Sequence, residues 1–240
     1  MKYKRIYLLS LFVLLMTVSA IKVNAMNTGF STEDLPEETR KSYMSGVLTR
    51  LNTEPAKQTF VCFDVNEQGL IAVGQEDNED KKICVYTSQG EFLYGYKFDT
   101  SGAFYVEWDG QNINLYKVRS GLIMSIDPDG YILDVKSVQN TYENSIYNHK
   151  VLESKKRIVG NITYVFRNNM GIFNRIASSY SQIVITDAEG AESVIYDVNS
   201  MQLARMIIAV SVILFVVVYV VIDLVRLTIK TRREYLRSEH

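Results

Sequence analysis

The hydrophobic positions divide the chain into two apolar runs near its ends and a long middle part. The first run, IYLLSLFVLLMTVSA, follows the basic start MKYKR, and the second, MIIAVSVILFVVVYVVIDLV, covers residues 206–225. Between them, short stretches rich in aromatic and β-branched residues alternate with polar turns, which is typical of β-strands. The pattern predicts a β-rich domain between two hydrophobic ends.

The first apolar run has the layout of a secretory signal peptide. It is shorter than the about 20 residues that a membrane-spanning helix needs. Basic residues precede it, and Val23 and Ala25 occupy the small-residue positions that follow it. We therefore predict a signal peptide over residues 1–25 with cleavage after Ala25, and an uncleaved signal anchor is the alternative.

The second apolar run predicts a transmembrane helix over residues 205–225. Its length matches a hydrocarbon core of about 30 Å, and its apolar residues cover every face rather than one stripe. Residues 226–240 carry five basic and two acidic side chains. Because basic flanks stay in the cytoplasm, we expect a basic cytoplasmic tail there and an extracellular domain before the helix.

The charge of the chain is distributed unevenly. The whole chain has a net charge of −1, but residues 26–204 hold 16 Lys and Arg against 24 Asp and Glu, a net charge of −8. An acidic surface argues against nucleic acid as a partner, because phosphate binding needs patches of Lys and Arg.

Three segments of the middle part share one spacing. The segments ICVYTSQGEF, IMSIDPDGYI and IVITDAEGAE each place an Ile seven residues before a Gly, and a Thr or Asp three residues before it. A Thr or Asp side chain at the first turn position accepts hydrogen bonds from the backbone ahead of it, proline suits the second position and glycine the fourth. Each segment therefore predicts a strand, a tight turn and a strand. The structural turn residues are Thr87, Gly90, Asp127, Pro128, Gly130, Asp187 and Gly190.

Further apolar runs precede each hairpin. They are TFVCFDVN and GLIAVGQ in the first unit, GAFYVEWDG and NINLYKV in the second, and ITYVFRN with a strand expected near Lys150 in the third. A repeat of about 40 residues with four strands is typical of propeller blades. We therefore predict a mostly β ectodomain over residues 58–204, with about three four-stranded antiparallel propeller-like blades.

The segments FDVNEQGLIAVGQEDNEDKKICVYTSQGEFLYGYKF and IMSIDPDGYILDVKSV resemble the NHL-type repeats of β-propellers. The resemblance covers about residues 58–198. It implies a four-stranded antiparallel blade and a role in binding partners or ligands, but it does not specify a chemistry, because propellers host many functions. Known propellers close with at least about four blades, whereas this sequence offers three.

Three blades leave two open sheet edges, and open edges present unpaired N–H and C=O groups that invite pairing. Two copies could join into a six-bladed ring, or a different protein could complete the ring. Alternatively, the sheets could curl into a sandwich or partial barrel with the N-terminal segment covering an edge. We expect an incomplete, propeller-like stack, because nothing in the sequence provides a fourth blade.

Residues 26–57 predict a partly helical segment instead of strands. Asp34 and Pro36 have the character of a helix start, and Tyr43, Val47 and Leu51 recur at helical spacing. We expect this helix to pack on the first blade, and a partner-binding helix is the alternative.

Histidine and cysteine are scarce, with two of each in the chain. His149 is expected to be a loop residue, because no other ligand stands at a characteristic spacing from it. Cys62 and Cys84 fall on the first and third strands of one unit, about 10 Å apart, which is too far for a disulfide and predicts two buried thiols. Residues 127–130 lack the further oxygens of a calcium loop, and the acidic residues within 76–80 predict a solvated hairpin loop. We expect no catalytic site, metal or cofactor.

These features predict a non-enzymatic, single-pass protein of the cell membrane. Its extracellular module is expected to bind or scaffold another envelope protein, or a second copy of itself. The alternative is a ligand-sensing accessory subunit of a membrane complex that reads a glycan, a peptide or an ion. A surface hydrolase is the third hypothesis, and the sequence shows no cluster of catalytic groups that would favour it.

Overall fold

The fold is described here from a computed structural model that covers residues 26–46, 48–77 and 80–238. The predicted signal peptide and Glu79 of the acidic run lie outside the described residues. Within them, the chain forms three antiparallel sheets followed by one long apolar helix.

The central sheet contains the first repeat unit and has the strand order β2-β6-β5-β4-β3. Its last four strands in the chain form a meander in which each strand pairs with the next. The strands are β2 (Thr49–Leu51), β3 (Phe60–Val65), β4 (Ile71–Asp77), β5 (Asp80–Tyr86) and β6 (Phe92–Phe98).

The second unit forms the lateral sheet, with the order β1-β10-β9-β8-β7, and the third forms the helix-linked sheet, with the order β11-β12-β13-β14. The lateral strands are β1 (Thr32–Asp34), β7 (Phe104–Asp109), β8 (Asn112–Lys117), β9 (Leu122–Ile126) and β10 (Ile132–Val138). The helix-linked strands are β11 (Lys156–Val159), β12 (Ile162–Arg167), β13 (Gln182–Thr186) and β14 (Glu192–Asp197).

The central sheet is buried on both faces. Neighbouring residues of a strand point to opposite sides, so that Cys62 packs toward the lateral sheet and Phe63 toward the helix-linked sheet. The lateral side of this core includes Phe104 and Leu115, and the helix-linked side includes Phe166. The first unit therefore lies between the second and the third, and the described sheets do not close into a ring.

The prediction of four-stranded units is correct only in part, because two of the sheets gain a fifth strand. Strand β1 pairs with β10, and strand β2 pairs with β6, each over three residues of the N-terminal segment. Unpaired edge groups of the second and first units are thus satisfied by the chain itself.

The N-terminal segment contains one helix, α2 (Glu37–Met44), between β1 and β2. The prediction that the helical pattern extends to Leu51 is wrong, because Leu51 lies in β2 and pairs with Gly95 of β6. The expected position on the first unit is also wrong. Helix α2 packs on β10 of the second unit, and Arg40 donates to Asp134 Oδ1 at 2.8 Å.

The link between the second and third units is helical. Thr141 caps α3 (Tyr142–Tyr147) by accepting a hydrogen bond from the Asn144 backbone N–H, and the helical turn η2 (Asn148–Leu152) follows. The strand predicted near Lys150 is therefore wrong, and the third unit begins at β11. Two short 3-10 helices, η1 (Val118–Ser120) and η3 (Gly171–Arg175), complete the connections.

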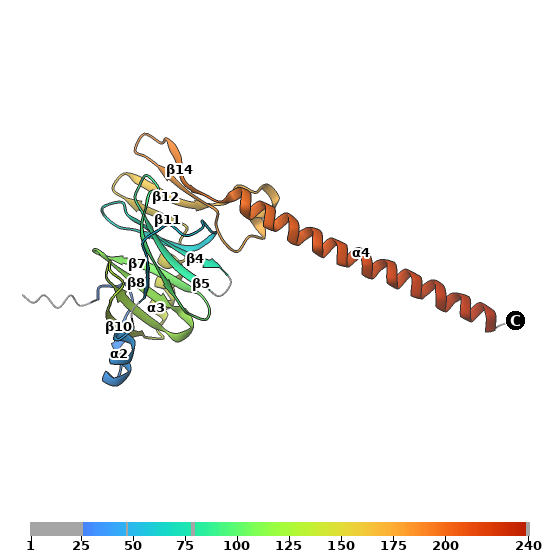
Figure 1. Cartoon of the computed structure of the whole chain (residues 1–240), viewed down its shortest axis with the longest axis horizontal. Coiled ribbons are helices and arrows are strands. Elements are labelled where there is room, and N and C mark those ends of the chain that lie inside the picture. The colour runs from blue at the N-terminus through green and yellow to red at the C-terminus, as the bar shows by residue number, and fades with distance from the viewer. Residues whose placement is uncertain (1–25, 47, 78–79, 239–240) are drawn as a thin grey trace, which may run out of the picture.

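Helix α4 (Asn199–Ser238) is continuous over 40 residues and extends away from the sheets (Figure 1). At 1.5 Å per residue it is about 60 Å long. Its part over Asn199–Thr231 is long and apolar enough to span a membrane, and its apolar window has no side chain buried against the rest of the described chain.

Candidate functional site

The junction between the sheets and α4 contains no linker. Strand β14 ends at Asp197 and α4 begins at Asn199. Gln202 is 5% exposed and donates to the Ser179 carbonyl oxygen at 3.0 Å, and Arg205 donates to Gln58 Oε1 at 3.2 Å. The first turns of α4 are therefore part of the folded domain, and the direction of the helix fixes the orientation of the domain.

Strand β14 forms an outer edge that pairs with no strand in the described part of the chain. Its residues Glu192, Ser193 and Val194 are exposed, and Val194 has 46% of its surface accessible. The turn that ends at Gly90 packs against the carbonyl of Ile195 in the middle of the strand. The free part of this edge is therefore its N-terminal half.

Asp64 on β3 connects the first strands of all three units. Its carboxylate accepts from the backbone N–H of Trp108 on β7 at 2.8 Å and from Arg157 Nε on β11 at 2.8 Å. The Arg157 guanidinium also donates to the Phe63 carbonyl and lies over the Phe63 ring. The side chains of Asp64 and Arg157 are only 17% and 12% exposed, so this ion pair lies largely out of water.

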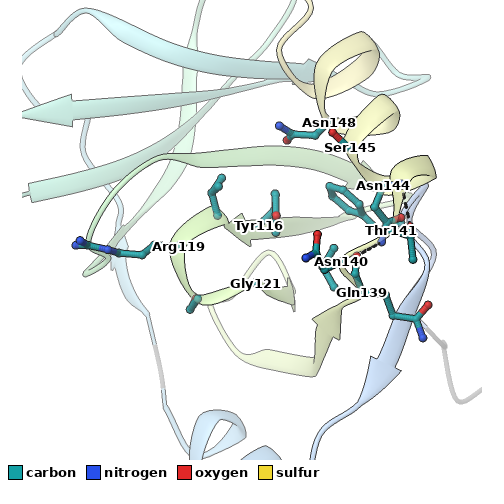
Figure 2. Close-up of a pocket in the computed structure, with 13 residues that line it drawn as sticks. Tyr116, Arg119, Gly121, Gln139, Asn140, Thr141, Asn144, Ser145 and Asn148 are labelled. Atoms are coloured by element: carbon teal, nitrogen blue, oxygen red, sulfur yellow. Dashed lines mark hydrogen bonds between the residues drawn. The ribbon is translucent and has the colours of Figure 1, made fainter.

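A polar pocket of about 450 Å³ lies on the lateral sheet, between the loop after β8 and helix α3 (Figure 2). Arg119 stands at one end, and Asn144, Ser145 and Asn148 of the helical link stand at the other. Most lining side chains are neutral amides and hydroxyls. The pocket is lined by Phe30, Tyr116, Val118, Arg119, Ser120, Gly121, Val138, Gln139, Asn140, Thr141, Asn144, Ser145 and Asn148.

One wall of the pocket is held by the N-terminal segment. Asn144 accepts from the Ser31 N–H at 2.8 Å and donates to the carbonyls of Ser31 and Gln139. The Phe30 ring packs on the Tyr116 ring with centroids 4.6 Å apart. Asn144 uses its amide fully within the fold, so its role is to shape the pocket.

Other polar groups of the pocket are left for a ligand. The side chains of Arg119, Gln139 and Asn140 make no hydrogen bond with any residue that the structure describes. The Asn148 Oδ1 atom is buried and likewise accepts no hydrogen bond there. Burial raises the pKa of the Tyr116 hydroxyl, which therefore stays protonated and able to donate. The pocket thus offers donors and acceptors with one positive charge.

The predicted turn residues form three turns of one geometry. Asp127 Oδ1 accepts from the N–H groups two and four residues ahead, and the Gly130 N–H donates to the Asp127 carbonyl. Thr87 and Asp187 make the same set of bonds in their turns. All three turn glycines have positive φ, and Pro128 occupies the second position of its turn. Each turn joins two neighbouring strands of one sheet, and the three turns are not brought into one site.

A fourth turn of the same geometry was not among the turns predicted from the sequence. It joins β3 to β4, where Asn66 Oδ1 accepts from the N–H groups of Gln68 and Leu70, and Gly69 has positive φ. Asn66 stands three residues before Gly69, so the spacing used for the other turns was present in the sequence.

The described residues hold no group of three or more potential metal ligands. His149 lies in η2 and contacts Glu153 through Nδ1 at 2.5 Å. Cys62 and Cys84 are free and buried, which confirms the prediction of two buried thiols, and burial raises the pKa of each to about 12. Thiols with such a pKa are poor nucleophiles.

Comparison with known proteins leaves the family open: no protein-family model and no curated protein matches the sequence.

Proposed function

We propose that the chain is a membrane-anchored module that binds another envelope protein at the outer edge of β14. The observation that carries the proposal is this unpaired edge, which lies on the strand that continues directly into α4. A partner strand added there would satisfy edge N–H and C=O groups, as β1 and β2 do on the other two sheets. The partner would be held at a fixed height above the bilayer.

Several features support the proposed topology. Helix α4 has the length and composition of a membrane anchor, and basic residues follow its apolar part. By the positive-inside rule, the proposal puts these basic residues in the cytoplasm and the three sheets outside. The same proposal includes an incomplete, propeller-like arrangement of the three sheets. It also includes the resemblance of the repeated sequence segments to NHL-type repeats.

Photo-crosslinking tests the proposed edge. We expect a photoreactive residue in place of Val194 to form a crosslinked product in native membranes, because a strand on this edge would lie within reach of its side chain. The matched control is Leu133 on β10, which is 40% exposed against 46% for Val194. The edge of β10 is covered by β1 at residues 136–138 and by α2, whose Arg40 bonds Asp134 next to Leu133.

Equal crosslinking at Leu133 and Val194, or none at either position, would contradict binding at this edge. A product of twice the chain mass would identify a second copy as the partner, whereas any other mass would identify a different protein by mass spectrometry.

The pocket favours a second function, that of a ligand-sensing accessory subunit. Its neutral amides and hydroxyls beside an aromatic ring suit a small neutral ligand rich in hydroxyl groups, such as a sugar. Its wall includes the N-terminal segment, so ligand binding would reach both the lateral sheet and the segment that covers its edge.

Sugar binding can be tested with glucose and N-acetylglucosamine as probes in saturation-transfer NMR. We expect the double variant Gln139→Ala with Asn140→Ala to weaken binding roughly tenfold, because two hydrogen bonds contribute about 1–3 kcal/mol. Gln111→Ala is the control, because Gln111 is exposed and lies outside the pocket. Equal affinity of the two variants, or no transfer to either sugar, would count against this function.

A further inference from the structure

The loop over residues 168–181, named the collar, carries apolar side chains that the folded domain leaves exposed. Ile172 is 82% exposed and Ile176 is 62% exposed. Phe215, in the middle of the apolar part of α4, is 73% exposed. Two isoleucines of the collar are therefore as uncovered as side chains of the proposed transmembrane span.

The collar is fixed to the first turns of α4. The Asn169 N–H donates to Asn199 Oδ1 at 2.9 Å, and Asn199 Nδ2 donates back to the Asn169 carbonyl at 2.8 Å. At its other end, Gln202 donates to the Ser179 carbonyl at 3.0 Å, and the Ser181 hydroxyl donates to Asn199 Oδ1. Figure 1 shows the gold segment of the chain beside the start of α4.

One face of α4 stays partly shielded beyond the first turns of the helix. Leu203, Met206 and Val210 recur on one face of the helix and are partly buried, whereas Ile207 and Ile208 between them are 48% and 64% exposed. Val210 lies about 16 Å along the helix from Asn199. The apolar span begins at Met206, so this shielding extends past the level where the hydrocarbon core is expected to begin.

Exposed cations surround the same region. Arg175 lies within the collar, Arg205 lies on α4, and the Lys155 ammonium is 5.1 Å from the ring of Tyr180. The domain as a whole is acidic, so cations at its end next to the apolar helix suit lipid phosphates.

We propose that the collar inserts Ile172 and Ile176 into the outer leaflet of the bilayer, while its neighbouring cations contact the lipid phosphates. The inference rests on the proposed membrane anchoring. A helix alone leaves a domain free to rotate about the helix axis, but a second contact beside the helix fixes one face of the domain toward the lipid. The β14 edge would then be presented in a constant direction.

Lipid-borne nitroxide quenching tests the proposal on the full chain in vesicles of phosphatidylcholine and phosphatidylglycerol. An environment-sensitive dye is attached to a cysteine introduced as Ile172→Cys or, independently, Ile176→Cys. The positive control is Ile208→Cys in the apolar span. The negative control is Tyr43→Cys on α2, which lies at the end of the domain remote from α4 (Figure 1).

We expect quenching at both collar positions to be of the same order as at position 208, and none at position 43. Quenching at 208 without quenching at 172 or 176 would overturn the collar proposal and leave the anchor intact. No quenching at 208 would instead overturn the membrane anchoring itself. Protection of the collar in native membranes but not in pure lipid would identify a protein as the occupant and would also overturn the proposal.

Discussion

Replacing Asp64 by alanine is expected to lower the free energy of unfolding of the folded domain by about 3 kcal/mol. The substitution removes the carboxylate that joins Trp108 and Arg157 and leaves the Arg157 guanidinium largely buried without its counter-charge. A loss of this size corresponds to a fall in Tm of roughly 6–12 °C for a domain of this length. Urea unfolding of the full chain in mild detergent measures it, with circular dichroism and the fluorescence of Trp108, the single tryptophan, as probes.

The matched control for Asp64→Ala is Asp129→Ala. Asp129 also pairs with an arginine, Arg50, but the two side chains are 68% and 35% exposed. An exposed pair contributes about 1 kcal/mol or less, so Asp129→Ala is expected to leave the unfolding midpoint almost unchanged. If both variants lost the same small amount, Asp64 would not be the connection between the three sheets.

The local parts of this fold could be predicted from the sequence because each depends on a few adjacent residues. A hairpin turn needs only an oxygen-bearing side chain and a glycine three residues later, as at Asp127 and Gly130. The long helix could be predicted because 20 successive positions are almost all apolar. The helical spacing of Tyr43 and Leu51 was misleading, because pairing of Leu51 with β6 outweighed the local preference.

The order in which the three sheets pack could not be predicted from local sequence patterns, although one pattern indicated which sheet is central. The runs FVCF and ICVY within β3 and β5 are apolar at consecutive positions rather than at alternate ones, which is typical of strands buried on both faces. This pattern places the first unit in the middle, where Cys62 and Phe63 face different sheets. No signal links Asp64 to Arg157, since they lie 93 positions apart.

The candidate sites depend on this long-range arrangement. The pocket combines Phe30 with the loop after β8 and with α3, so no single segment of the sequence carries it. The β14 edge differs from the other outer edges only because the N-terminal segment covers those two and not the third. Both candidate sites therefore depend on where the N-terminal segment packs: it pairs with two of the sheets, leaves β14 unpaired, and contributes Phe30 to the pocket.

The three turn glycines provide a graded test of how closely each turn packs against a neighbouring sheet. Alanine at any of them must adopt positive φ, which costs roughly 1–2 kcal/mol. A Cβ at Gly190 would meet nothing within 4 Å, whereas at Gly130 it would lie 3.2 Å from the Leu48 carbonyl oxygen and at Gly90 only 2.4 Å from that of Ile195. We therefore expect the loss of stability to increase from Gly190→Ala through Gly130→Ala to Gly90→Ala.

The backbone of Ile195 must move to admit a methyl group at position 90, and overpacking of this kind adds about 1–3 kcal/mol. Gly90→Ala is therefore expected to cost roughly 3 kcal/mol in urea unfolding, against roughly 1 kcal/mol for Gly190→Ala. Because Ile195 lies on the strand that enters α4, Gly90→Ala should also reduce crosslinking from position 194, whereas Gly190→Ala should not. Equal losses for the two variants would mean that the turn at Gly90 does not hold β14 against the central sheet.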